Sequence, residues 1–135
     1  MIIRAQIVPR QFLHGHVPTA VGRFHLQSVD RVPATNHLNL AIGLPLRNQD
    51  ALNKLLQQIY DPASTNYHRY LTPEQFTEQF GPTEQDYQAV VNFAKTSGLT
   101  VTATYPNRTL VDVSGNAATV EKVFHVALRV YRHPT

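Results

Sequence analysis

The sequence predicts an α+β fold of the ferredoxin-like type, with one antiparallel sheet, helices packed on one face and an inserted helical element. Two observations lead to this prediction. Segments with the two-residue period of strands alternate with segments of helical period, in the order strand, helix, strand, strand, helix, strand. A pair of short helices is inserted after the first helix. This order is that of the split βαβ arrangement.

Hydrophobic spacing defines the first strand and the first helix. Residues 38–44 place Leu or Ile at every second position, as expected for a strand with one face in the core. Asn48 is suited to the N-cap of the helix that follows, and the pair Asp61 and Pro62 is suited to its end. Between these limits, four aliphatic residues recur at helical spacing: Leu52, Leu55, Leu56 and Ile59.

An aromatic loop at residues 67–71 then leads into two short helices, and capping residues mark the start of each. Thr72 can accept a backbone hydrogen bond as N-cap, Pro73 fits the first helical position, and Gln75 can complete a capping box. Gly81 ends this helix, and Thr83 caps the next one. The acidic residues that follow Thr83 place negative charge against the positive end of that helix.

The same rules define the elements nearer the C-terminus. Gly98 ends the second short helix, whose apolar residues lie at helical spacing: Tyr87, Val90, Val91 and Ala94. Asn116 caps a final helix, and residues 127–131 form a final β-rich strand.

A tight turn at residues 106–108 joins two strands whose register can be inferred. A two-residue loop would pair Val101 with Asp112 and bring a carboxylate to the buried face. A three-residue loop avoids this, because it shifts the second strand by one residue. The sequence therefore predicts two buried cross-strand pairs: Val101 with Val113, and Ala103 with Val111.

Prolines and charge distinguish the N-terminal part from the rest of the chain. Residues 1–34 hold three prolines and no clean period, so we expect an extended arm with a short strand near residues 22–29. Residues 35–135 form the folded domain. The net charge of +3 arises within the arm, because residues 35–135 hold eight basic and eight acidic side chains. The sequence pI of about 9.5 therefore reflects the arm.

Composition excludes several functional classes. No apolar run approaches the ~20 residues needed to span a bilayer, and no signal-peptide core is present, so we expect no membrane partner. The chain has no cysteine, which excludes disulfides and thiol catalysis. No G-x-S-x-G turn or other nucleophile motif is found.

The predicted sheet leaves one face uncovered by helices. Most side chains on that face are small and uncharged, which suits docking of a partner protein. We assign these residues to it: Asn39, Ala41, Thr100, Thr102, Thr104, Leu110, Arg129 and Tyr131.

Residues 67–83, with the sequence YHRYLTPEQFTEQFGPT, resemble the signature of the pro-kumamolisin activation domain. This family forms the N-terminal propeptide of sedolisin (serine-carboxyl) peptidases. The similarity covers roughly residues 35–135, because residues 38–46, 61–64 and 123–126 also resemble the family in the same order.

The resemblance implies a ferredoxin-like fold and the function of a zymogen prosegment. Such a domain is an intramolecular chaperone for the peptidase domain of a secreted precursor, and it inhibits that domain until acid triggers cleavage. The implied partner is the cognate sedolisin-type peptidase domain, and the implied location is extracellular. The family's catalytic residues and calcium site belong to the peptidase domain, so we expect no catalytic, cofactor-binding or metal-binding residue here. Arg132 and His133 lie at the approach to the linker that leads to the peptidase, and we add them to the docking residues.

A mechanism of acid release follows from charge. Arg69, in the aromatic loop, is a candidate for pairing with a partner carboxylate. Pairing depresses the pKa of the carboxylate, so the binding that it contributes is lost as pH falls through the depressed value. Charging all seven histidines would instead raise the net charge from +3 to +10 and strengthen such pairs. Histidine is therefore not the expected trigger unless one is buried.

Three alternatives are open at this stage. His14 and His16 could suggest a metal, although a closed zinc site needs four donors and none stand nearby at ordered spacing. An RNA-recognition domain shares the ferredoxin-like order, but residues 108–113 lack its basic-Gly-aromatic pattern, so we expect no nucleic-acid partner. A free-standing peptidase inhibitor is the third alternative.

Overall fold

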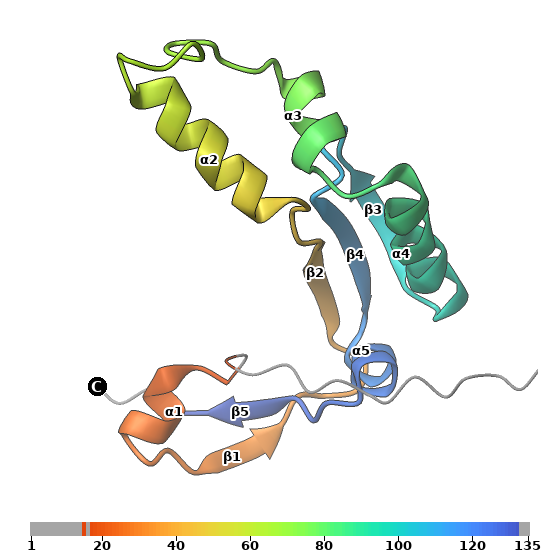
Figure 1. Ribbon diagram of the computed structural model, residues 1–135. Helices are drawn as coiled ribbons and strands as arrows, with labels where there is room; N and C mark the ends of the chain where they lie inside the picture. Colours follow the sequence, from red (N-terminus) through yellow and green to blue (C-terminus); the bar gives the residue numbers. More distant parts are fainter. Residues whose placement is uncertain (1–14, 16, 133–135) are drawn as a thin grey trace, which may run out of the picture. The chain divides into compact units, whose positions relative to one another are not determined.

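The computed structural model describes residue 15 and residues 17–132, which form two compact units. One unit comprises residues 33–127, and the other combines residues up to 32 with those from 128 onward. Within the described residues, five helices and two antiparallel sheets give an α+β fold (Figure 1). The predicted fold class is confirmed.

The larger unit is built on a three-stranded sheet with the order β2–β4–β3. Its strands are β2 (His37–Gly43), β4 (Leu110–Asn116) and β3 (Thr100–Thr104). Both pairings are antiparallel, so β4 is central and hydrogen-bonded on both sides. The strand and helix order of this unit agrees with the predicted ferredoxin-like arrangement.

Helices cover one face of this sheet. Helix α4 (Glu84–Thr96) contacts β3 and β4, and α5 (Ala117–Phe124) contacts β4 and β2. Helices α2 (Gln49–Tyr60) and α3 (Pro73–Phe80) precede α4 in the chain and are joined by the aromatic loop (Figure 1). The core residues that lie between α4, α5 and the sheet are buried: Tyr87, Val91, Ala94, Leu99, Val111, Val113, Ala117 and Val120.

The predicted register of the β3–β4 hairpin is confirmed at one pair and wrong at the other. Val101 pairs with Val113 as expected. Ala103 pairs with Asp112 rather than with Val111, because a β-bulge after Val101 inserts one extra residue into β3. Side-chain alternation alone contains no signal for such a bulge.

Local capping chemistry was predicted well. Thr72 accepts the Gln75 N–H, and the Gln75 side chain accepts the Thr72 N–H in return, so the capping box at α3 is complete. The side chains of Thr83 and Asn116 cap α4 and α5. Asn48 occupies the N-cap position of α2, but its backbone is left-handed and its side chain makes no cap hydrogen bond.

The smaller unit differs from the extended arm that we expected. It contains α1 (Thr19–Arg23) and β1 (Ser28–Arg31), which lies later than the strand predicted near residues 22–29. β1 pairs with β5 (Arg129–Tyr131) in a two-stranded antiparallel sheet. The expectation of one sheet that includes the final strand was therefore wrong. A three-residue strand has too little pattern to specify its partner from sequence.

Candidate docking surface

The uncovered face of the β2–β4–β3 sheet brings together most residues predicted to dock a partner. Thr100 and Thr102 are exposed on β3, whereas Val101 between them is half-buried, because successive side chains of a strand lie on opposite faces. Leu110 on β4 is 40% exposed, although it is aliphatic. Two residues of β2, the neighbour of β4 on its other side, are exposed as well: Asn39 and Ala41. The assignment of Thr104 to this face was wrong, because the bulge pairs Thr104 with the core residue Val111 and so turns its exposed side chain to the other face.

Asp112 lies at the centre of this face and is held by a tyrosine from the hairpin turn. The Tyr105 hydroxyl donates a hydrogen bond of 2.6 Å to Oδ2 of Asp112. This hydrogen bond and the nearby negative charge of Asp112 both favour the protonated hydroxyl, so the pKa of Tyr105 is raised above its ordinary value. The sequence placed Asp112 outside the core but gave no sign of this tyrosine partner.

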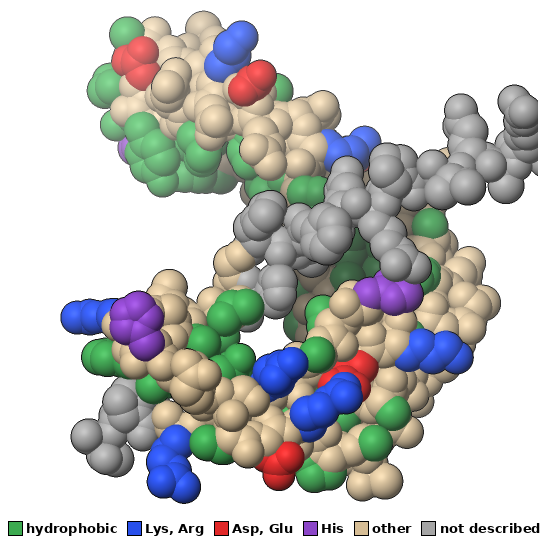
Figure 2. Space-filling view, turned by 90° about the horizontal axis from the view of Figure 1, so that it is seen from below, with side chains coloured by type: hydrophobic (Ala, Val, Ile, Leu, Met, Phe, Trp, Pro, Cys, Tyr) green, Lys and Arg blue, Asp and Glu red, His purple; other side chains and the backbone are tan. Residues whose placement is uncertain are grey.

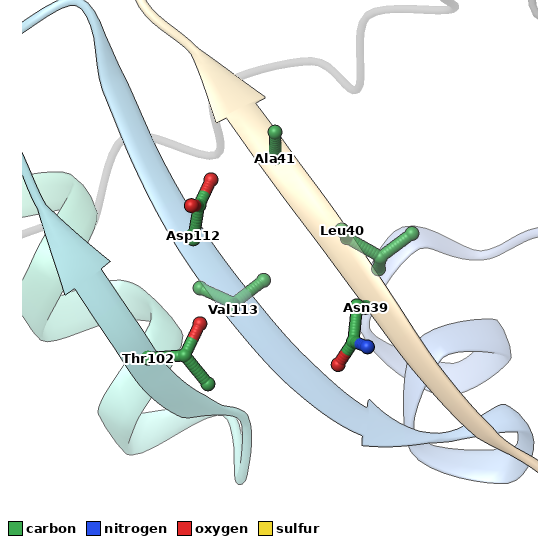
Figure 3. A pocket seen from close by; sticks show the side chains of 6 residues that line it. All are labelled: Asn39, Leu40, Ala41, Thr102, Asp112 and Val113. Carbon is green, nitrogen blue, oxygen red and sulfur yellow. The ribbon is translucent and has the colours of Figure 1, made fainter.

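An open hollow surrounds Asp112. It has a volume of about 490 Å³ and is lined by residues of all three strands: Asn39, Leu40, Ala41, Thr102, Asp112 and Val113. Figure 3 shows Asp112 on the central strand, between Ala41 on one neighbouring strand and Thr102 on the other. The short side chain of Ala41, which pairs directly with Asp112, leaves the carboxylate accessible.

Arg108 fixes the turn that carries Tyr105. Its backbone is left-handed, with φ of 58°, and its side chain is 13% exposed. The guanidinium lies 2.7 Å from Oε1 of Glu78 in α3 and 3.5 Å from Oε2 of Glu84 in α4. These carboxylates raise the pKa of Arg108, with the hydrogen bond to Glu78 as the main cause. The turn is therefore tied to two helices.

A second arginine, Arg47, also has a structural role, which the sequence did not reveal. Its Nε donates to the carbonyl of Gly81, and its Nη2 donates to the carbonyl of Glu78 at 2.8 Å. The next residue, Asn48, donates from its side chain to the carbonyl of Gln79 at 3.0 Å. These carbonyls lie at the C-terminal end of α3, where a cation is favourable. Contacts between residues 31 or more positions apart leave no local pattern.

The aromatic loop presents its rings at the surface. The Tyr67 and His68 rings stack at a centroid distance of 3.8 Å, and His68 and Tyr70 lie 6.1 Å apart. Tyr70 remains 64% exposed, and Arg69 between these rings is exposed too. Within the described residues, the Arg69 side chain makes no hydrogen bond or ion pair, so it is free to meet a partner.

The remaining predicted docking residues do not belong to this sheet. Arg129 and Tyr131 lie on β5 of the smaller unit, where Arg129 Nη1 donates a hydrogen bond of 3.5 Å to Ser28 Oγ. Arg132 is exposed after β5. His133 lies outside the described residues.

The described residues also bear on metal binding, membrane crossing and surface charge. They contain no group of three or more side chains suited to hold a metal ion. None of their helices combines the length and apolar character that crossing a membrane would require. On the face shown in Figure 2, the Lys and Arg side chains are interspersed with acidic and neutral ones.

Comparison with known proteins reveals clear relatives. Residues 25–135 match the sequence model of a family described as the pro-kumamolisin activation domain. The chain is 35% identical over 102 residues to xanthomonalisin from Xanthomonas sp. (strain T-22), a match that covers 76% of this chain and 12% of that protein.

Two further relatives have the same pattern of partial coverage. Sedolisin from Pseudomonas sp. (strain 101) is 32% identical over 94 residues, covering 70% of this chain and 16% of sedolisin. Tripeptidyl-peptidase 1 from Canis lupus familiaris is 32% identical over 71 residues, covering 53% of this chain and 13% of that protein. The chain thus spans only a small part of the length of each relative.

Proposed function

This chain belongs to the pro-kumamolisin activation domain family, and from that membership we propose that it is the prosegment of a sedolisin-type serine-carboxyl peptidase. In this role it inhibits the peptidase domain, assists its folding as an intramolecular chaperone, and is removed on activation. The observation that carries the proposal is the match of an activation domain over residues 25–135, most of the chain.

We assign the peptidase activity of the precursor to a domain other than this one. The matched region covers 12% of xanthomonalisin and 16% of sedolisin, so most of each relative lies outside the comparison. In this proposal the catalytic residues belong to that remaining part. The chain described above therefore serves as a binding partner of the peptidase and catalyses no reaction itself.

The uncovered sheet face is the surface that we assign to docking on the peptidase domain. It is exposed on both outer strands and uncharged except for Asp112, so covering the rest of it costs little desolvation of ionic groups. Arg108 and Tyr87 fix the β3–β4 hairpin, which forms part of this face. The face is therefore a preformed surface. A preformed surface also suits a chaperone, because it can template the element that docks on it.

Acid release is assigned to carboxylates of the peptidase that pair with cations of this chain. Arg47 and Arg108 are engaged within the chain, which leaves exposed cations such as Arg69 and Arg132 for that role. A paired carboxylate has a depressed pKa, so its contribution to binding is present at neutral pH and lost in acid. The family resemblance further suggests that the precursor is exported and acts outside the cell.

The experiment that tests the proposed function measures inhibition and refolding with the isolated chain. We expect slow, tight inhibition of mature xanthomonalisin or sedolisin at the upper end of its active pH range. We also expect that peptidase unfolded in denaturant and then diluted into neutral buffer regains more activity when the chain is present. A folded chain that neither inhibits nor raises the yield would contradict the proposal.

A further inference from the structure

We propose that the hollow around Asp112 receives a Lys or Arg side chain of the peptidase domain, so that Asp112 is the charged anchor of the docking face. This inference rests on the proposed function, since it takes the peptidase as the partner. It adds the chemistry of the partner's contact and the residue of this chain that recognises it.

Charge is the first argument for a cationic partner group. Asp112 is the one carboxylate among the described residues of the uncovered face, and no ion pair joins it to a cation of the described chain. Its neighbours on the face are neutral: Asn39, Ala41, Thr100, Thr102 and Leu110. Covering an unpaired carboxylate with a protein surface is costly unless a cation and hydrogen bonds compensate it.

The geometry of the hollow provides that compensation. The Tyr105 hydroxyl, 2.6 Å from Oδ2, fixes the carboxylate and leaves Oδ1 to accept from a partner. Thr102 and Asn39 line the same hollow, and their hydroxyl and amide oxygens can accept further hydrogen bonds from an ammonium or guanidinium group. The volume of about 490 Å³ accommodates one long side chain together with water. Because the carboxylate is already fixed, little of its conformational freedom is lost when a partner binds.

The same charge pattern argues against a second copy of this chain as the occupant. In a two-fold symmetric pair, the same patch lies on both sides of the interface. The described residues of this patch include no Lys or Arg, so each Asp112 would meet neutral residues or its own equivalent. A different protein with a Lys or Arg at this position would pair with the carboxylate, which a second copy of this patch cannot do.

The test compares two variants that each remove one negative charge. Asp112→Asn keeps the shape of the side chain and its capacity to accept from Tyr105. Asp50→Asn is the matched control, because Asp50 is exposed in the first turn of α2 and not part of the face. Dissociation constants with mature xanthomonalisin or sedolisin would be measured at neutral pH, and circular dichroism would verify folding of each variant.

We expect Asp112→Asn to weaken binding by about tenfold to a hundredfold, as for loss of a charge-assisted hydrogen bond, while Asp50→Asn binds like the wild type. Tyr105→Phe keeps the charge but releases the carboxylate, so it should weaken binding by a smaller factor. Added salt should weaken the wild-type complex more steeply than the Asp112→Asn complex.

Several outcomes would overturn the inference, and they are distinguishable. Equal binding of Asp112→Asn and wild type would overturn the anchor role while the prosegment function stands. Absence of wild-type binding by a folded chain would overturn both. Size-exclusion chromatography that shows a dimer dissociated by Asp112→Asn would assign the face to a second copy and overturn the peptidase as its occupant.

Discussion

Nη2 of Arg108 lies 2.7 Å from Oε1 of Glu78, although 30 positions separate the two residues in the chain. Nη1 of the same guanidinium lies 3.5 Å from Oε2 of Glu84. One side chain from the hairpin turn thus connects α3 and α4, and the turn also carries Tyr105, which holds Asp112. The same turn thus connects two helices to the proposed docking face.

Two carboxyl groups, Glu74 and the Arg108 partner Glu84, should make stability depend on pH. The pKa of Glu84 is lowered, first by its hydrogen bond from Gln88 and then by Arg108, and the pKa of Glu74 is lowered by hydrogen bonds at the start of α3. A carboxyl group with a lowered folded-state pKa stabilises the fold above its unfolded pKa, and this contribution disappears as pH falls through the folded value. The free energy of unfolding should therefore fall on acidification below about pH 5.

Arg108→Ala should reduce that pH dependence as well as the stability at neutral pH. Urea unfolding at neutral and acidic pH would measure both effects. Arg69→Ala is the control, because Arg69 is an exposed arginine with no side-chain partner among the described residues. If the two variants showed the same loss of stability between neutral and acidic pH, the electrostatic role of Arg108 would be wrong.

Tyr87→Phe should destabilise the larger unit by about 1–3 kcal/mol, because it leaves two backbone groups without a partner. The Tyr87 hydroxyl donates to the carbonyl of Leu110 at 2.8 Å and accepts the N–H of Tyr105 at 2.9 Å. Chemical denaturation would measure the change. Tyr60→Phe, at a side chain that is 69% exposed, should have little effect, and an equal loss at both positions would refute the bridging role.

Thr72→Ala should cost about 1 kcal/mol, since it removes the side-chain half of the capping box at α3. Thr65→Ala, in the exposed part of the preceding loop, serves as control. Hydrogen exchange of the first turn of α3 should accelerate in the first variant and not in the second. Unchanged exchange at both sites would mean that packing, rather than the cap, determines where α3 begins.

Thr100→Arg should weaken binding to a sedolisin-type peptidase by about tenfold or more, because a covered face would have to desolvate the added charge. Thr100 lies on the docking face but does not line the hollow, so this variant tests the face itself. Gln57→Arg, exposed on α2, adds the same charge elsewhere. Equal affinity of the two variants would show that the face stays uncovered in the complex.

Features set by neighbouring residues could be predicted from sequence. The N-caps Thr72, Thr83 and Asn116 lie where short-range rules place them, and Gly98 follows α4 with a positive φ of 85°. The two-residue period of the strand likewise identified Thr100 and Thr102 as exposed, because alternate side chains of a strand lie on opposite faces. These rules operate over a few residues, and the sequence contains all of the relevant information.

Features set by distant residues could not be predicted in this way. The pairing of β5 with β1, and the caps that Arg47 provides for α3, depend on chain segments that meet only after folding. Asp112 was correctly kept out of the core, but its role required the position of Tyr105 and of the neighbouring Ala41. The exposed face of the sheet was therefore predictable in outline, and the carboxylate at its centre was not, while the docking role of this face remains a proposal.

The most direct test of the central claim is the pH dependence of the complex between this chain and a sedolisin-type peptidase. Fluorescence anisotropy of the labelled chain, titrated from neutral pH downward, would follow dissociation. We predict a tight complex at neutral pH that dissociates with a midpoint near 4, in the carboxyl range. A midpoint near 6 would contradict release through carboxylates, and the absence of a complex at every pH, with the chain folded, would contradict the prosegment function.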